Sequence, residues 1–308
     1  MAVSACGTVT KIVVYVKKDM QVPSLFKMKC FCTLLVCAAC ATLLLPASAH
    51  AGIPAEPEIR LGSVAMDIPA EMHRRLTPLT KYLSDTLKRP VVLKLSPSMS
   101  AAIDDVSSGS VELAYLTPVA YLKARAKGET QLVVKTLTSG KASFRLMIVV
   151  RKDSPIRRIQ DMKGKSFAFG DKAAILQRAV VVGAGMPLEN LGEYKFIGHY
   201  DNIAKGVANG DFDAGILKDT TANDWERRGL RILHRSPPLP PYNIVASNKV
   251  DAKLLKQIRQ AFLALDIRNP AHKKIILALD DEYSGFAPAS DADYDVVRQL
   301  IAPFEETN

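Results

Sequence analysis

Cysteine is missing from most of this chain. The 308 residues include five cysteines (Cys6, Cys30, Cys32, Cys37 and Cys40), and all of them precede residue 41. The rest of the chain therefore has no thiol for a disulfide, a metal ligand or a nucleophile. Cys37 and Cys40 have the spacing of a CxxC motif, but they lie inside an apolar run, which speaks against a redox or metal site. Lipid attachment at Cys40 stays open, although the apolar run continues past it to Leu45.

The motifs of several enzyme classes are missing as well. The chain has no G-x-S-x-G nucleophile elbow and no P-loop, and Gly183-Ala184-Gly185 lacks the third glycine of a dinucleotide-binding loop. No spacing of His, Asp and Glu matches a metal site. We therefore expect a protein without enzymatic activity, cofactor or bound metal.

Charge of one sign is not concentrated anywhere in the sequence. The chain carries 41 Lys and Arg against 31 Asp and Glu, a formal net charge of +10, yet basic residues never run beyond adjacent pairs. Surfaces that bind nucleic acid instead gather Lys and Arg among aromatic residues. We expect no nucleic-acid partner, whereas a mild preference for an anionic ligand is allowed.

The first 51 residues combine a basic start, an apolar core and an Ala-x-Ala end. Lys27 and Lys29 precede the apolar stretch Phe31–Leu45, and Ala49-His50-Ala51 follows it. This three-part pattern predicts a secretory signal peptide over 1–51 that is cleaved after Ala51 or, alternatively, after Ala49. Met28 would serve as an alternative initiator. An uncleaved anchor is disfavoured, because the apolar core is short for a membrane span of about 20 residues.

The chain after the signal is organised around two similar strand–helix–strand units. One unit consists of a strand at Val91–Leu95, a helix at Ala101–Val106, a stop at Gly109 and a strand at Val111–Leu116. The other consists of a strand at Tyr194–Gly198, a helix that Asp201 caps, a stop at Gly210 and a strand at Phe212–Leu217. Since open α/β sheets bind ligands at the carboxyl ends of their strands, two such units suggest two facing lobes around a ligand.

The remaining pattern predicts where the chain crosses between the lobes. Ser139-Gly140-Lys141 is a candidate hinge, and the proline-rich stretch Ser236–Pro241 is extended enough to form the return crossing. We therefore expect a discontinuous first lobe (residues 56–140 and 242–308) and a continuous second lobe (residues 141–241). Helical segments at His272–Leu279 and Ala292–Ile301 are predicted to end the chain.

Four stretches together resemble a known family. They are PLTKYLSDTLKRPVVLKL, VELAYLTPVAYLKA, RKDSPIRRIQDMKGKSFAFGD and FIGHYDNIAKGVANGDFDAGILKD. The chain resembles the periplasmic phosphate/phosphite/phosphonate-binding proteins of ABC importers over most of Ile59–Ser247. The resemblance implies an α/β venus-flytrap fold of two lobes, each a mixed sheet flanked by helices, with the solute clamped between them. It also implies a periplasmic location.

The resemblance implies binding residues too. The pocket-lining positions after the family's third strand match Tyr115, Thr117, Pro118 and Tyr121, the cleft histidine matches His199, and the acidic residue after the Asp-Ala-Gly strand matches Asp219.

The sequence departs from the family where phosphonate binders carry a Ser-Thr-Ser run at the start of a helix. This chain has Lys172-Ala173-Ala174 instead. A helix N-terminus with Lys172 still favours an anion, but Asp171 is a good N-cap that would occupy its N–H groups. Arg145 either pairs with an acidic ligand group or is solvated. We expect a small polar or anionic solute, of the phosphate, phosphite or phosphonate class.

Two functions fit these features best. The first is a monomeric receptor that delivers its small-molecule ligand to an inner-membrane ABC permease by closing its lobes. The alternative is a periplasmic sensory protein that binds a similar solute and signals to a membrane kinase or chemoreceptor. An exported enzyme on the same fold would need catalytic residues that the sequence does not contain.

Overall fold

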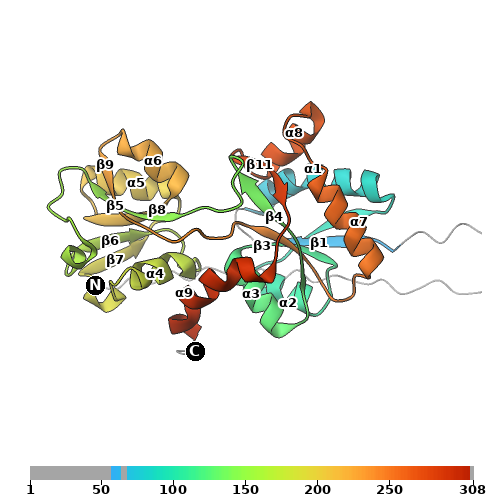
Figure 1. Cartoon of the computed structure of the whole chain (residues 1–308), viewed down its shortest axis with the longest axis horizontal. Helices are drawn as coiled ribbons and strands as arrows, with labels where there is room; N and C mark the ends of the chain where they lie inside the picture. Colours follow the sequence, from blue (N-terminus) through green and yellow to red (C-terminus); the bar gives the residue numbers. More distant parts are fainter. Residues whose placement is uncertain (1–56, 64–67, 306–308) are drawn as a thin grey trace, which may run out of the picture. The chain divides into compact units, whose positions relative to one another are not determined.

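The computed structural model describes residues 57–63 and 68–305, and Figure 1 shows their arrangement. The predicted signal peptide lies outside these residues. The strands are β1 (Ile59–Ser63), β2 (Val91–Leu95), β3 (Leu113–Leu116), β4 (Gln131–Thr138), β5 (Leu146–Arg151), β6 (Ser166–Phe169), β7 (Glu193–Phe196), β8 (Ala214–Lys218), β9 (Leu230–Arg235), β10 (Asn243–Ala246) and β11 (Tyr283–Ala287). The α-helices are α1 (Pro69–Leu87), α2 (Met99–Ser107), α3 (Pro118–Lys127), α4 (Ile175–Gly183), α5 (Tyr200–Asn209), α6 (Asp219–Glu226), α7 (Ala252–Leu263), α8 (Pro270–Leu279) and α9 (Asp295–Glu305). Short 3-10 helices occupy Ile159–Met162, Leu188–Asn190 and Asp291–Tyr294.

The first sheet has six strands in the order β11-β4-β10-β3-β1-β2. β1 pairs in parallel with β2 and β3, whereas β10 runs antiparallel between β3 and β4. Helices α1, α7 and α8 cover one face, and α2 and α3 cover the other (Figure 1). The sheet is therefore mixed and flanked by helices on both sides, as predicted.

Alternation along the strands explains why both faces of this sheet are covered. Leu113 and Tyr115 of β3 point into the core beneath α1 and α7, whereas Ala114 and Leu116 point to the opposite core beneath α2 and α3. Successive strand side chains face opposite sides. A strand that is apolar at every position must therefore be buried on both faces, which only a three-layer arrangement provides.

The second sheet has five strands in the order β7-β6-β8-β5-β9. β6 pairs in parallel with β7 and β8, and β5 runs antiparallel to β8 and β9. Met147 and Val149 of β5 pack beneath α5 and α6, while the intervening Ile148 packs on the side of α4. This sheet is also mixed and covered on both faces (Figure 1).

The two predicted crossings pair with each other. Ser139 and Gly140 both have positive φ, 48° and 77°, and Thr138 and Lys141 close the turn with two hydrogen bonds of 2.9 Å. This is the backbone pattern of a tight hairpin turn, so the candidate hinge is a hydrogen-bonded element. Further along, Phe144 and Leu239 exchange backbone hydrogen bonds of 3.0 and 2.8 Å, which ties the outgoing crossing to the returning one.

Three predictions about local structure were wrong. Asp201 does not cap α5, because His199 is the N-cap and Asp201 lies in the first turn. The segment Lys172-Ala173-Ala174, expected at the start of a helix, lies before α4, which begins at Ile175. The strand β11 was not predicted at all, because Tyr283–Ala287 contains a glycine and is flanked by acidic residues and Pro288. By contrast, Gly210 ends α5 with φ 85°, as predicted.

The last helix packs against elements of both sheets. Val297 and Ile301 of α9 belong to the same buried cluster as Leu176 and Val180 of α4, and Tyr121 of α3 joins this cluster. The predicted lobe boundaries stay a prediction. The C-terminal segment nevertheless contacts the helix that follows β6, although it was assigned to the first lobe.

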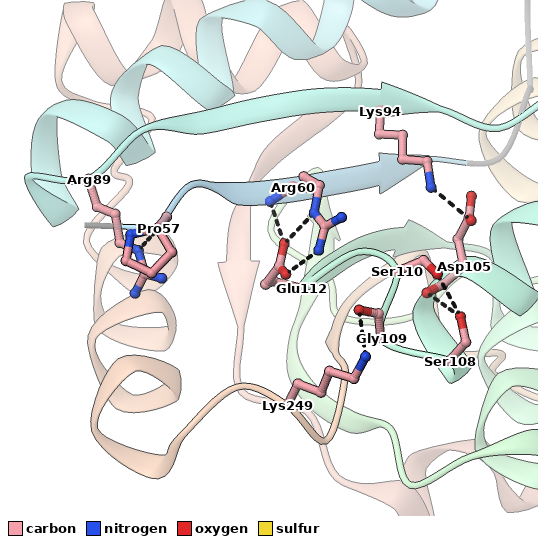
Figure 2. Close-up of polar contacts among 10 residues, drawn as sticks. All are labelled: Pro57, Arg60, Arg89, Lys94, Asp105, Ser108, Gly109, Ser110, Glu112 and Lys249. Atoms are coloured by element: carbon pink, nitrogen blue, oxygen red, sulfur yellow. Dashed lines mark hydrogen bonds and ion pairs between the residues drawn. The ribbon is translucent and has the colours of Figure 1, made fainter. Parts of the chain in front are cut away.

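Ion pairs tie the strands β1 and β2 to neighbouring segments (Figure 2). Glu112 accepts hydrogen bonds from the Arg60 backbone at 2.7 Å and from its guanidinium at 2.7 and 3.1 Å. Asp105 binds Lys94 at 2.9 Å and Ser96 at 2.8 Å. Because these charged groups satisfy one another, we interpret the two pairs as structural contacts, one between β1 and the segment before β3 and one between β2 and α2.

Candidate functional site

A cavity of about 510 Å³ is lined by residues of both sheets. It lies at the carboxyl ends of β3 and β8, which is where open α/β sheets place their ligands. Its lining comprises Arg75, Tyr115, Thr138, Phe144, His199, Tyr200, Asp201, Lys218, Thr220, Thr221, Pro241, Tyr242, Leu279, Asp280, Asp281, Glu282 and Tyr283. The volume fits a small solute.

Aromatic side chains form one wall of this cavity. The rings of Tyr115 and Tyr242 lie 5.3 Å apart between centroids, at an interplanar angle of 31°. The hydroxyls of Tyr115 and Tyr283 form a hydrogen bond of 2.7 Å. These contacts fix three rings from β3, β11 and the segment before β10. Burial raises the pKa of each of these tyrosines, so all three are neutral at physiological pH.

The second sheet contributes hydrogen-bond donors. Lys218 ends β8 and is the N-cap of α6, and Thr220 and Thr221 lie in the first turn of that helix. His199 is the N-cap of α5, and neither its side chain nor that of Lys218 caps its own helix. Two helices therefore begin at the cavity, and helix N-termini present N–H groups and a partial positive charge. The buried Thr220 hydroxyl has no hydrogen-bond partner among the described residues.

The loop between α8 and β11 contributes three carboxylates. Glu282 forms an ion pair with Lys218. In the described part of the chain, neither Asp280 nor Asp281 has an ion-pair partner; the Asp280 carboxylate accepts the backbone N–H of Glu282 at 2.9 Å, and the Asp280 carbonyl accepts that of Tyr283 at 3.1 Å. Burial raises the pKa of Asp280, and the neighbouring Glu282 and Asp281 raise it further against the opposing effect of Lys218.

The cavity lining is acidic overall. Four carboxylates (Asp201, Asp280, Asp281 and Glu282) face two basic side chains (Arg75 and Lys218), a formal charge of −2 with His199 neutral. Arg75 is also bound at 2.8 Å to Glu71, which is not part of the lining. A bare oxyanion would therefore meet donors on one side and uncompensated negative charge on the other.

Two of the predicted binding residues, Tyr115 and His199, line this cavity. Three others lie elsewhere in the first sheet's surroundings. The Thr117 hydroxyl caps α3 by accepting the Ala120 N–H at 3.2 Å, and Pro118 occupies the first turn. Tyr121 donates its hydroxyl hydrogen to Asp291, and its ring lies 4.7 Å from that of Tyr294. The Thr117 and Tyr121 side chains therefore have structural partners, and Pro118 is buried at the start of α3.

The residues at the start of α4 are also outside the cavity lining. Ala173 donates its N–H to the Asp171 carboxylate at 2.8 Å, and Ala174 donates to the Asp171 carbonyl at 3.0 Å. The carbonyl of Lys172 accepts a hydrogen bond of 2.9 Å from Arg178. The chain itself therefore occupies the N–H groups of Ala173 and Ala174, as the sequence suggested for Asp171.

Arg145 and Asp219 line a second, smaller depression of about 310 Å³. The Asp219 carboxylate accepts the backbone N–H groups of Arg145 at 3.0 Å and Thr220 at 3.1 Å. The Arg145 guanidinium binds the carbonyl of Ser236. The Asp219 side chain thus joins the start of α6 to the residue before β5, whereas the Arg145 side chain reaches the returning crossing at Ser236. Their predicted contact with ligand stays a prediction.

Most residues that line the cavity were not predicted from the sequence. Lys218 could have been predicted, because it ends a buried strand directly before the predicted binding residue Asp219. Tyr242 follows the proline-rich crossing, a position that also could have been noticed. No sequence pattern indicated that Asp280, Glu282 and Tyr283 line the cavity. The strand β11 was not predicted, so the position of the loop before it relative to the first sheet could not be inferred.

Within residues 57–63 and 68–305, no group of His, Cys, Asp and Glu side chains could hold a metal ion. No helix in that part of the chain has the length and apolar character that a membrane crossing needs.

Comparison with known proteins places these features in a family context. Residues 61–294 match the family model described as "ABC transporter, phosphonate, periplasmic substrate-binding protein". The phosphate-import protein PhnD of Mycolicibacterium smegmatis is 23% identical over 299 residues, which cover 87% of this chain and 92% of that protein.

Solved structures share the fold. XAC2383 from Xanthomonas citri, bound to chloride ion, superimposes with a TM-score of 0.68 at 20% identity, covering 81% of this chain and 98% of that one. PhnD1 from Prochlorococcus marinus, in complex with methylphosphonate, superimposes with a TM-score of 0.66 at 19% identity and the same coverage. These similarities confirm the predicted periplasmic-binding-protein fold.

Proposed function

Because this chain belongs to the family of phosphonate periplasmic substrate-binding proteins of ABC transporters, we propose that it captures its solute in the cavity beside Lys218. As a member of that family, it is the solute-binding component of an ABC importer, with a small-molecule ligand and a membrane permease as partners. The family consists of binding proteins rather than enzymes. The ligand class is phosphate, phosphite or phosphonate.

The observation that carries this proposal is the convergence of α5 and α6 on one cavity. Their N-termini bring His199, Lys218, Thr220 and Thr221 to its lining. An oxyanion there would receive charge-assisted hydrogen bonds from the Lys218 ammonium and neutral ones from the hydroxyls. The unpaired hydroxyl of Thr220 would gain the partner that it lacks among the described residues.

The proposal moves the oxyanion site from the start of α4 to the starts of α5 and α6. At α4 the Ser-Thr-Ser run is replaced by Lys172-Ala173-Ala174, and Asp171 occupies two N–H groups. At the start of α6 the Asp219 carboxylate likewise occupies the Thr220 N–H, but the Thr220 hydroxyl keeps a donor without a partner among the described residues. This hydroxyl lines the same cavity as the Lys218 ammonium, and that combination suits an anion better than α4 does.

Two matched variants test this choice. The protein, stripped of co-purified solute by unfolding and refolding, is titrated calorimetrically with phosphate, phosphite and methylphosphonate. We expect Thr220→Val, which keeps the side-chain shape, to weaken binding of the best ligand several-fold, and Lys172→Met to leave it unchanged. Weakening by Lys172→Met alone would move the site back to α4, and absence of binding by every ligand of the panel would refute the assigned solute class.

We also propose export by cleavage after Ala51 and a monomeric state in solution. The first rests on the basic, apolar and Ala-x-Ala segments of residues 1–51. Sequencing the N-terminus of the periplasmic protein tests the cleavage position, and light scattering tests the monomer. A mature chain that begins at residue 1 or a stable dimer would contradict these two proposals.

A further inference from the structure

The helices on one face of the first sheet carry most of the excess positive charge of the described residues. This basic helix layer consists of α1 with the following Lys88 and Arg89, and of α7 and α8 from the N-cap Asp251 onward (Figure 1). Its two segments, 69–89 and 251–279, contain 11 Lys and Arg against 4 Asp and Glu, a formal charge of +7. The other described residues contain 25 Lys and Arg against 23 Asp and Glu, a formal charge of +2. The fold therefore gathers charge that is spread along the sequence.

Contacts of Tyr82 bring the three helices of this layer together. The Tyr82 hydroxyl on α1 donates a hydrogen bond of 2.8 Å to the Ala261 carbonyl of α7, and its ring lies 5.7 Å from that of His272 on α8. Because a helix rises 1.5 Å per residue, Lys256 and Lys88 lie about 8 and 9 Å along their own helices from this meeting point. These distances are comparable to the Debye length of about 10 Å at 0.1 M salt, so the positive potentials of the layer add up.

The excess charge of the layer is displayed by lysines. The arginines of the layer and Lys81 bind Glu71, Asp85 or Asp266, or else a backbone carbonyl. Five lysines are exposed and form no ion pair among the described residues: Lys88, Lys253, Lys256, Lys273 and Lys274.

Two helices of the layer begin with lysines where acidic residues are favoured. Lys253 is the second residue of α7 and Lys273 the fourth of α8, and neither helix has an acidic residue in its first turn. Cations are unfavourable there, because the start of a helix carries a partial positive charge. The N-cap Asp251 offsets part of this cost in α7, whereas the N-cap of α8 is the neutral Asn269. Residues that are locally unfavourable are expected where function requires them.

From this arrangement, we propose that the exposed face of α1, α7 and α8 binds the surface of an anionic phospholipid membrane through these five lysines. Each lysine close to such a surface is attracted to it, and the attraction falls off within a Debye length. Ammonium groups on flexible stems suit a fluid, hydrated layer of headgroups, whereas protein–protein interfaces are depleted in lysine and enriched in arginine and aromatic residues. The contact keeps the receptor close to the membrane of its permease. It goes beyond the proposed function, since it does not depend on what the cavity binds.

Vesicles of different charge test this proposal. Co-sedimentation is measured with vesicles of mixed phosphatidylglycerol and phosphatidylcholine and with vesicles of phosphatidylcholine alone. The protein is purified after export, and N-terminal sequencing verifies that the apolar stretch Phe31–Leu45 has been removed. We expect binding to the mixed vesicles at about 0.01 M salt and its loss at about 1 M salt, where the Debye length is only about 3 Å. Vesicles of phosphatidylcholine alone should not bind the protein.

Two variants with the same change of net charge locate the contact. The layer variant combines Lys253→Glu, Lys256→Glu, Lys273→Glu and Lys274→Glu. The control variant changes four exposed lysines outside the layer, Lys123→Glu, Lys163→Glu, Lys165→Glu and Lys205→Glu. We expect the layer variant to bind the mixed vesicles at least about tenfold more weakly than the control variant does. Thermal unfolding verifies that both variants are folded.

The outcomes separate the membrane from other anionic partners and from the oxyanion site. Absence of binding to the mixed vesicles at low salt, or equal weakening by the two variants, overturns the proposal. Tighter binding to poly-glutamate or to duplex DNA than to the vesicles also overturns it, in favour of an acidic protein or a nucleic acid. The layer variant should bind methylphosphonate as the original protein does, so the membrane contact and the oxyanion site are tested independently.

Discussion

The ion pair between Lys218 and Glu282 provides a test in which stability and binding change separately. Their side chains are 19% and 35% exposed, so the pair is partly shielded from water. Replacing Lys218 by Met leaves Glu282 without its cation and next to Asp280 and Asp281. An unpaired, partly buried charge costs about 1–3 kcal/mol, so we expect a loss of that size in the free energy of unfolding.

The same substitution removes the strongest donor proposed for the oxyanion. A hydrogen bond to a charged group contributes about 1.5–3 kcal/mol, so Lys218→Met should raise the dissociation constant for the best-binding phosphonate by about ten- to a hundredfold. Glu282→Gln has the opposite effect on binding, because Lys218 loses its competing carboxylate and the cavity loses one negative charge. We expect equal or tighter binding of the phosphonate by this variant.

The double variant Lys218→Met/Glu282→Gln distinguishes the two effects. It leaves no unpaired charge at this position, so most of the stability lost in Lys218→Met should return, while binding stays weak. Urea unfolding measures the first quantity and titration calorimetry the second, with Lys205→Met on the exposed face of α5 as the control. If folded Lys218→Met binds phosphonate as tightly as the original protein, Lys218 does not contact the oxyanion and the proposed site is refuted.

Further predictions concern the last helix, a buried acid and a helix end. Ile301→Ala should lower the free energy of unfolding by about 2–5 kcal/mol, because Ile301 is 1% exposed between α9 and α4. The control Leu263→Ala, at an exposed position, should lower it far less. Equal effects of the two variants in urea unfolding would mean that α9 does not pack against α4. Asp280→Asn should stabilise the ligand-free protein at pH 7, but not below the ordinary Asp pKa of 3.8. Because folding raises the Asp280 pKa, the stability that this carboxyl contributes is present at low pH and is lost as pH rises. A difference in melting temperature that does not depend on pH would contradict this. Gly210→Ala should cost about 1 kcal/mol, since φ is 85° at the end of α5, and an unchanged urea midpoint would show that the helix ends differently.

Much of the fold followed from local sequence patterns. The leucines and isoleucine of α7 recur at helical spacing, and its N-cap Asp251 accepts the Leu254 N–H at 2.9 Å. Buried strands such as β3 and β8 were recognised as apolar runs bounded by turns, although each begins two residues later than predicted. These features depend on neighbours within a few residues, and the sequence displays such neighbours directly.

The candidate site was only partly visible in the sequence. Tyr115 and His199 were named through the family resemblance, and both line the cavity. Tyr121 and Thr117 match family positions as well, but Asp291 and the Ala120 N–H occupy their hydroxyls. A motif specifies which residue type stands at a position, but not which group its side chain contacts. The partner of Tyr121 is Asp291, more than a hundred residues further along the chain.

The sequence by itself determined the α/β class, the paired strand–helix–strand units and the turn at Gly210, and the family resemblance added the two mixed sheets. Only the tertiary structure decided that α9 packs on α4, that β11 joins the first sheet, and that Asp280 and Glu282 meet Lys218 and the tyrosines around one cavity. Helix and strand formation depends on periodicity along the chain, so it can be read in order. The charge of the cavity depends on which distant loops fold together, and no local pattern encodes that sum.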